Sequence, residues 1–165
     1  MIKRVAVILA LAYLSFVCEF ILYNVFGPWG KPELLILLFI FFNLYLGIRY
    51  SLVAAIAAGF LRDASSVSPF GTYLFVYVAG AYCTTVVNKY LYQPGSRFSR
   101  VMVALVVVLF CFTVELVLHM IEYDVRLTEV LTYVLWPQLV TTMVAATFVF
   151  LRMRDVSVFF ALKSK

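Results

Sequence analysis

Long apolar runs separated by short polar segments are the main pattern along this chain. Six such runs predict six helices, at residues 5–26, 33–48, 50–62, 72–88, 101–121 and 129–151. At about 1.5 Å per residue, the first run is long enough to span a bilayer. No small-residue cleavage site follows it, so we interpret it as an uncleaved helix. The pattern therefore predicts an all-α integral membrane protein with one transmembrane domain, residues 1–165.

The apolar stretch between residues 33 and 62 is predicted to form two short helices. One continuous helix would place Arg49 near the middle of the membrane, where a charge is costly, and Gly47 marks a natural break. After these two helices, residues 64–71 read Ala-Ser-Ser-Val-Ser-Pro-Phe-Gly. This is the least helical composition in the chain and predicts a loop or re-entrant segment, which must be buried in protein if it enters the membrane.

The distribution of Lys and Arg predicts the orientation in the membrane. With six spans and both termini cytoplasmic, only three of the 13 Lys and Arg residues (Lys31, Arg62 and Arg126) lie outside. With five spans, the Lys and Arg residues are divided less unevenly between the two sides of the membrane, and Arg49 lies within the lipid. The positive-inside rule therefore favours six spans. The ten cations predicted to lie inside are Lys3, Arg4, Arg49, Lys89, Arg97, Arg100, Arg152, Arg154, Lys163 and Lys165.

Composition narrows the function classes further. Hydrophobic residues make up 65% of the chain and charged residues 13%, with a mean hydropathy of +1.06. A soluble enzyme, a secreted disulfide scaffold and a disordered tail are excluded, because so much apolar surface requires lipid as its solvent. The net charge of +5 does not indicate nucleic-acid binding, since the charges lie in short patches between apolar runs. The three cysteines lie within apolar runs, without metal or redox spacing.

Two acidic residues inside predicted membrane helices are candidates for function. Glu19 and Glu115 fall at similar depth, in the outer half of the membrane, and His119 lies one turn after Glu115 on the same helix face. Such residues mark functional sites by default. The favoured interpretation is contact with other helices or with a partner. A proton or substrate site is the second, and a metal site the third, because two candidate ligands do not complete a metal site.

The end of the predicted 50–62 helix carries a second group of candidates. Small residues up to Gly59 allow close helix packing in lipid. Arg62 and Asp63 either end the helix at the interface or fix the following loop. In the second case the Asp63 carboxylate is expected to accept bonds from the backbone or hydroxyls of Ser65 and Ser66.

The same segment resembles a known family. Gly59-Phe60-Leu61-Arg62-Asp63, a serine-rich stretch, and then Pro69-Phe70-Gly71-Thr72-Tyr73-Leu74 resemble the hallmark of MreD, the rod shape-determining membrane proteins. The matching positions are Gly59, Asp63, Pro69 and Gly71. The Pro32-Glu33 helix start, the length and the six-span layout also fit. The motif covers about 16 residues, while the topology covers most of the chain.

The resemblance implies a non-enzymatic scaffold of the cell-elongation machinery in the bacterial inner membrane. It implies direct binding to MreC, contact with RodA and a class B penicillin-binding protein, and MreB filaments near the basic inner face. It implies no cofactor, no metal and no nucleic acid. The family is also similar in fold to the substrate-binding subunits of vitamin transporters. A small-molecule-binding subunit of a membrane transporter therefore stays open as the alternative function.

Overall fold

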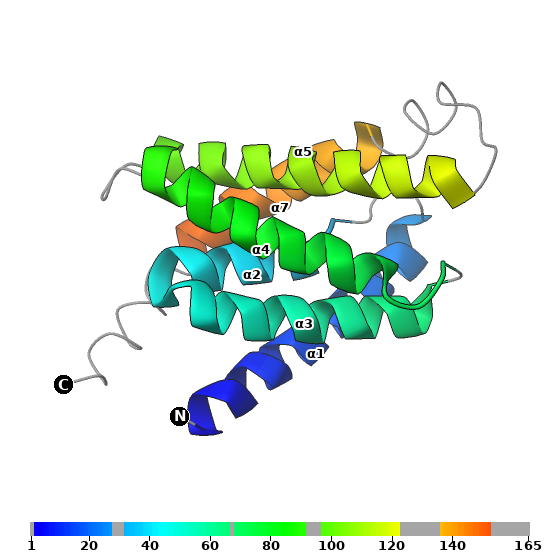
Figure 1. Cartoon of the computed structure of the whole chain (residues 1–165), viewed down its shortest axis with the longest axis horizontal. Helices are drawn as coiled ribbons and strands as arrows, with labels where there is room; N and C mark the ends of the chain where they lie inside the picture. Colours follow the sequence, from blue (N-terminus) through cyan, green and yellow to red (C-terminus); the bar gives the residue numbers. More distant parts are fainter. Residues whose placement is uncertain (1, 28–31, 67, 92–96, 123–135, 153–165) are drawn as a thin grey trace.

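The computed structural model describes residues 2–27, 32–66, 68–91, 97–122 and 136–152. These residues form helices and no strand, as the sequence predicts (Figure 1). By length and composition, two helical segments are able to cross a membrane, Arg4–Val25 and Phe98–Leu118. The helices are α1 (Ile2–Phe26), α2 (Leu34–Leu46), α3 (Ile48–Ser65), α4 (Thr72–Leu91), α5 (Arg97–Glu122) and α7 (Trp136–Arg152).

The helix α2 lies at the centre of the bundle. Every residue from Leu35 to Asn43 is buried, because α2 is apolar on all its faces and has no polar side to turn outward. The helices α1, α3, α4, α5 and α7 all contact it. By contrast, α1 runs diagonally across α3 at the edge of the bundle (Figure 1) and has many exposed apolar side chains.

The junction between α2 and α3 falls where the sequence predicts a break, but α3 is longer than expected. Gly47 separates the helices with a φ of +86°, a conformation that glycine adopts without steric cost. The helix α3 has 18 residues and continues to Ser65, past the predicted end at residue 62. The Ser65 hydroxyl donates to the carbonyls of Leu61 and Arg62, at 3.2 and 3.0 Å. These bonds continue the last turn, so the predicted loop at 64–71 begins two residues later.

The other predicted helices differ mainly at their ends. The helix α4 continues to Leu91 and α5 already begins at Arg97, while the predictions were 72–88 and 101–121. The predicted helix at 129–151 is described from Trp136 onward as α7. Its first predicted residues, 129–135, lie outside the described part of the chain.

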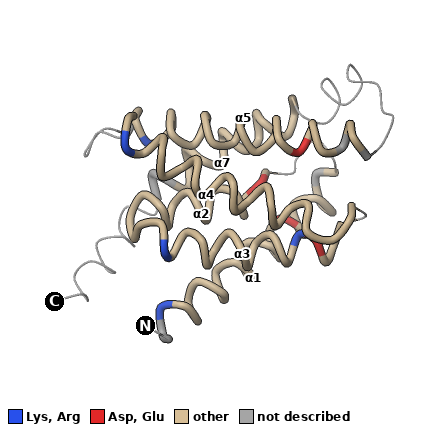
Figure 2. The backbone as a smooth tube through the Cα atoms, viewed as in Figure 1, with Lys and Arg blue, Asp and Glu red and all other residues tan. Residues whose placement is uncertain are grey.

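Successive helices run in alternating directions, which brings the basic helix ends together. Figure 2 shows the blue segments of α1, α3 and α5 at the end of the bundle that holds the N-terminus. The red segments lie in the interior and towards the opposite end, together with one blue segment. We call the group Arg4, Arg49, Lys89 and Arg100 the cationic end. Two of its arginines donate to tyrosine hydroxyls, Arg4 to Tyr50 at 3.4 Å and Arg100 to Tyr45 at 2.7 Å.

Candidate functional site

A buried ion cluster lies at the opposite end of α3. Arg62, only 8% exposed, extends from the last turns of this helix. Its Nη2 donates to Glu33 Oε1 at 2.6 Å, and its Nη1 to Glu19 Oε2 at 3.4 Å. The two carboxylates are each 2% exposed. Arg62 therefore joins α1, α3 and the segment before α2 inside the protein.

Further polar groups complete the bonding of the two acids. The Tyr77 hydroxyl of α4 donates to Glu33 Oε2 at 3.1 Å, and the Gln138 amide of α7 donates to Glu33 Oε1. The backbone N–H of Leu35 donates to Glu19 Oε1 at 2.8 Å. All four carboxylate oxygens of Glu19 and Glu33 thus accept hydrogen bonds, as buried charges require. We call Glu19, Glu33, Arg62, Tyr77 and Gln138 the buried charge cluster.

Glu115 joins the same part of the core through a tyrosine. The Tyr73 hydroxyl donates to Glu115 Oε1 at 2.9 Å, and the Arg62 guanidinium lies 5.4 Å from the centre of the Tyr73 ring. Glu115 on α5 is therefore linked to Arg62, and so to Glu19, through one aromatic side chain. The side chain of His119 lies outside the described residues, so its relation to Glu115 stays a prediction. Among the described residues, no group of three or more His, Cys, Asp or Glu could hold a metal ion.

Asp63 binds the start of α4. Its Oδ2 accepts the N–H groups of Gly71 and Leu74, both at 3.1 Å, and its Oδ1 accepts that of Tyr73 at 2.9 Å. The first N–H groups of a helix have no partner within the helix, and a carboxylate there also interacts favourably with the helix dipole. Asp63 therefore caps α4 from the neighbouring helix.

The expected partners of Asp63 were wrong. The hydroxyl of Ser65 donates to backbone carbonyls of α3, and that of Ser66 donates to the backbone carbonyl of Asp63, at 3.3 Å. The Asp63 carboxylate does fix the following loop, but at its far end, through the Gly71 N–H, and it also bonds the first turn of α4. It reaches both because α3 and α4 pack side by side.

The other motif residues explain how α3 and α4 approach. A Cβ on Gly59 would lie 2.6 Å from the Cα of Leu74, so only glycine allows this separation. Gly71 has a φ of +106°, which strongly favours glycine. The Pro69 carbonyl accepts the N–H and hydroxyl of Thr72 at 3.3 and 2.9 Å. Gly59, Asp63, Pro69 and Gly71 thus form one unit, which we call the α3–α4 junction.

Sequence reasoning missed Glu33, Tyr77 and Gln138 as members of the cluster. Glu33 was interpreted only as part of a helix start. Tyr77 and Gln138 lie 44 and 105 residues from Glu33 along the chain, and no local spacing connects them. The one available signal was Glu33 itself, a carboxylate directly before the most apolar of the described helices.

Comparison with known proteins identifies the family. The family model of rod shape-determining protein MreD matches residues 1–156, a range that includes the buried charge cluster and the α3–α4 junction. The match confirms the resemblance found in the segment from Gly59 to Leu74. No match was found among curated proteins or among solved structures.

Proposed function

Because the chain belongs to the rod shape-determining protein MreD family, we propose that it is a non-enzymatic scaffold of the bacterial cell-elongation machinery. In this proposal it binds MreC directly and is linked through MreC to RodA and a class B penicillin-binding protein. MreB filaments lie near its basic inner face. The family itself is one of membrane proteins that determine rod shape; the partners are our proposal.

The buried charge cluster is the observation that supports a scaffold most strongly. Its charged side chains are directed at one another, and they join four helices and the segment before α2. Breaking such a buried pair is strongly destabilising, so the cluster favours one fixed arrangement of the helices. A fixed arrangement suits a protein whose surface must fit other membrane helices. The Glu19 and Arg62 side chains therefore act as polar-core contacts in this proposal.

The proposed topology has six spans with both termini in the cytoplasm. Alternating helix directions and the cationic end support it, since Lys and Arg favour the cytoplasmic side of a membrane. In this orientation the cationic end faces the cytoplasm, while the buried charge cluster and the α3–α4 junction lie in the outer half of the membrane. The proposed location is the cytoplasmic membrane of a bacterium.

The test is an affinity pull-down of the tagged protein from its native cells in mild detergent, with mass spectrometry of bound proteins and metabolites. Recovery of MreC, RodA and a penicillin-binding protein without a stoichiometric metabolite is the expected result. Recovery of ATPase subunits or of a retained vitamin would instead establish the alternative, a substrate-binding subunit of a transporter.

A second measurement links binding to shape. Cells depleted of the protein are expected to become round and to regain rod shape when the wild-type chain is supplied. Arg62→Ala, which breaks the buried charge cluster, is expected to fail to restore the rods. Arg49→Ala, which removes an exposed arginine of the cationic end, is the matched control and is expected to restore them. Equal rescue by both variants would show that the cluster is not needed for shape.

A further inference from the structure

The charges of the cationic end have no counter-ion in the described part of the chain. Figure 2 shows no red segment among the coloured parts of the backbone at this end. None of the four cations forms an ion pair with another described residue, whereas Arg62 at the opposite end forms two. The cationic end therefore attracts an anion from outside the chain.

Three of these cations lie where a helix disfavours a positive charge. Arg4, Arg49 and Arg100 are among the first four residues of α1, α3 and α5, and the first turns of these three helices contain no acid. The start of a helix carries the positive end of its dipole, which favours an acid there and disfavours a base. Helix stability therefore does not explain these positions. An anion bound at this end would be attracted by the arginines and by the helix dipoles together.

Two arginine–tyrosine pairs connect neighbouring helices at this end. Arg4 of α1 donates to the hydroxyl of Tyr50 on α3, and Arg100 of α5 donates to that of Tyr45 on α2. Each hydroxyl accepts with its oxygen, and neither donates its own hydrogen to another described residue. Each guanidinium also has further N–H groups. A pair thus presents a charged donor beside an O–H donor, a combination that suits the oxygens of a phosphate.

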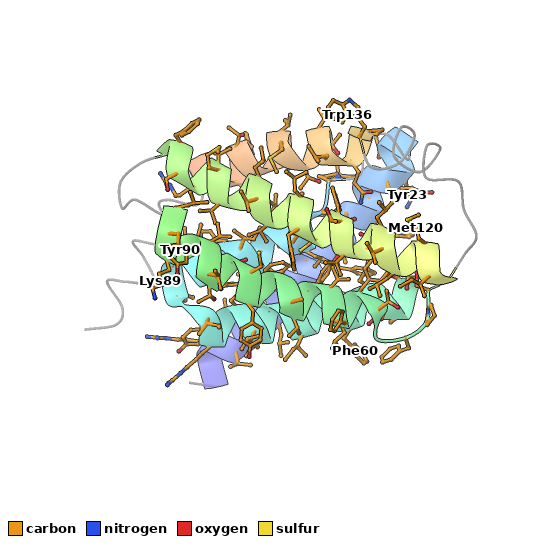
Figure 3. All side chains as sticks on the ribbon, turned by 45° about the horizontal axis from the view of Figure 1, so that its top comes forward. Tyr23, Phe60, Lys89, Tyr90, Met120 and Trp136 are labelled. Carbon is orange, nitrogen blue, oxygen red and sulfur yellow. The ribbon has the colours of Figure 1, made fainter. Side chains whose placement is uncertain are left out.

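Tyrosines also indicate the depth of the cationic end in the membrane. Figure 3 shows Lys89 and Tyr90 together at the end of α4, and the Lys89 Nζ lies 5.9 Å from the centre of the Tyr90 ring. Tyrosine favours the head-group level of a membrane, where its ring meets apolar groups and its hydroxyl meets polar ones. All four cations belong to helices and not to the segments between them. In the proposed topology they lie at head-group level, where the available anion is a lipid phosphate.

We propose that the cationic end binds anionic phospholipids of the phosphatidylglycerol type, and that each arginine–tyrosine pair donates to the phosphate of one lipid. Because each pair connects two helices, a bound phosphate links α1 to α3 and α5 to α2. The inference goes beyond the scaffold role and does not depend on MreC binding. The assignment to the cytoplasmic leaflet rests on the proposed topology, but the binding itself does not.

Native mass spectrometry of the full-length protein in detergent tests the proposal. The protein is titrated with phosphatidylglycerol or, separately, with phosphatidylcholine of the same acyl chains, whose phosphate is accompanied by a cation. Phosphatidylglycerol is expected to be retained more strongly, and the difference is expected to decrease as salt is raised, because salt screens the charges. Equal retention of the two lipids would overturn the proposal.

Charge-removing variants locate the binding. Arg4→Gln and Arg100→Gln are each expected to lower the affinity for phosphatidylglycerol about five-fold, the effect of one basic residue at an anionic membrane surface. Arg126→Gln removes the same charge at a position that the sequence predicts to lie on the outer side, and it is expected to bind like the wild type. Thermal melting measured in parallel shows that the variants are folded. Equal affinity of all three variants would contradict the site.

The tyrosine contact has its own test. Tyr45→Phe keeps every charge of the protein but removes the hydroxyl beside Arg100. We expect the affinity for phosphatidylglycerol to fall, though less than in Arg100→Gln, since one donor to the phosphate is lost. Tyr82→Phe removes the hydroxyl of an exposed tyrosine on α4 and is the matched control. Unchanged affinity of Tyr45→Phe would overturn the arginine–tyrosine pair as the phosphate ligand.

Other anions are distinguished in the same experiments. Glycerol phosphate, which has the phosphate but no acyl chain, is expected not to displace the lipid. Displacement at equal concentration would identify a soluble phosphate compound as the ligand and overturn the lipid. If Arg4→Gln and Arg100→Gln kept their affinity for lipid but lost a protein from the pull-down, the cationic end would bind an acidic protein segment instead. Absence of MreC from the wild-type pull-down would count against the scaffold proposal alone.

Discussion

The arginines at the two ends of this bundle differ in what surrounds them. Arg62 is 8% exposed and meets two carboxylates and an aromatic ring. Arg49 is exposed, while Arg4 and Arg100 are half-buried and donate to tyrosine hydroxyls. The same type of side chain therefore holds helices together at one end of the bundle and lies nearer the surface at the other.

This difference shows that counting Lys and Arg residues does not predict whether a given arginine lies in the protein core or near the surface. Removal from water is expensive for every charge, and only a partner of opposite sign offsets it. Arg62 counted as one of three cations on the outer side, but its acids place it in the core. The grouping of basic residues at the cationic end, by contrast, was predictable from the number and sequence positions of Lys and Arg alone.

The largest expected effect follows from removing the buried cation. Arg62→Ala leaves Glu19 and Glu33 buried without a counter-ion, and we expect it to lower the free energy of unfolding by about 3–5 kcal/mol. Thermal melting in detergent, followed by size-exclusion chromatography, measures the change. Arg49→Ala is the control, for which we expect a change within about 0.5 kcal/mol.

A compensating variant makes this prediction sharper. Adding Glu33→Gln to Arg62→Ala removes one of the uncompensated charges, so the double variant is expected to be more stable than Arg62→Ala alone. If Arg62→Ala melts like the wild type, or if the second substitution lowers stability further, the ion cluster does not hold the helices together as described.

Asp63 carries the next largest expected effect. Asp63→Ala leaves three N–H groups at the start of α4 without their acceptor, and we expect a loss of about 1–3 kcal/mol. Ser66→Ala removes a hydroxyl that donates only to a backbone carbonyl in the same stretch, and it is the matched control. Equal melting temperatures for the two variants would contradict the cap from the neighbouring helix.

Close approach of α3 and α4 is tested by Gly59→Ala. The added methyl group meets the backbone of Leu74 at 2.6 Å, which no side-chain rotation relieves. Overpacking is expected to cost about 1–3 kcal/mol, and better helix propensity offsets about 1 kcal/mol of it, so we expect a net loss of up to about 2 kcal/mol. Ala64→Ser adds an atom at an exposed position of the same helix and should change little. A more stable Gly59→Ala protein would show that the helices separate freely.

The smallest expected effect concerns the link to α5. Tyr73→Phe removes the hydrogen bond to Glu115 while it keeps the ring beneath Arg62, and we expect a loss of about 1 kcal/mol. Tyr82→Phe removes a hydroxyl from a tyrosine that is 54% exposed and is expected to melt within about 0.5 kcal/mol of the wild type. Identical melting curves for the two variants would mean that Glu115 is not tied to the core through Tyr73.

Local patterns in the sequence were sufficient for the all-α class and for the motif that identifies the family. The apolar runs determined where helices form, and the break at Gly47 followed from a glycine next to a charge. Gly59, Asp63, Pro69 and Gly71 lie within 13 residues of one another, so their relation was visible in the chain. Their spacing did not show that the Asp63 carboxylate caps α4, since that bond requires the two helices to lie side by side.

The partners of the buried charges were decided by tertiary packing alone. Glu33 meets Arg62, Tyr77 and Gln138 at sequence separations of 29, 44 and 105 residues. Periodicity along one helix reports which face is apolar, but it does not report which residue of another helix faces a given carboxylate. The sequence by itself therefore determined where helices form, which family the chain belongs to and which residues form the cationic end. The bundle determined which charges are paired, because only packing brings distant polar groups together away from water and makes their bonds necessary.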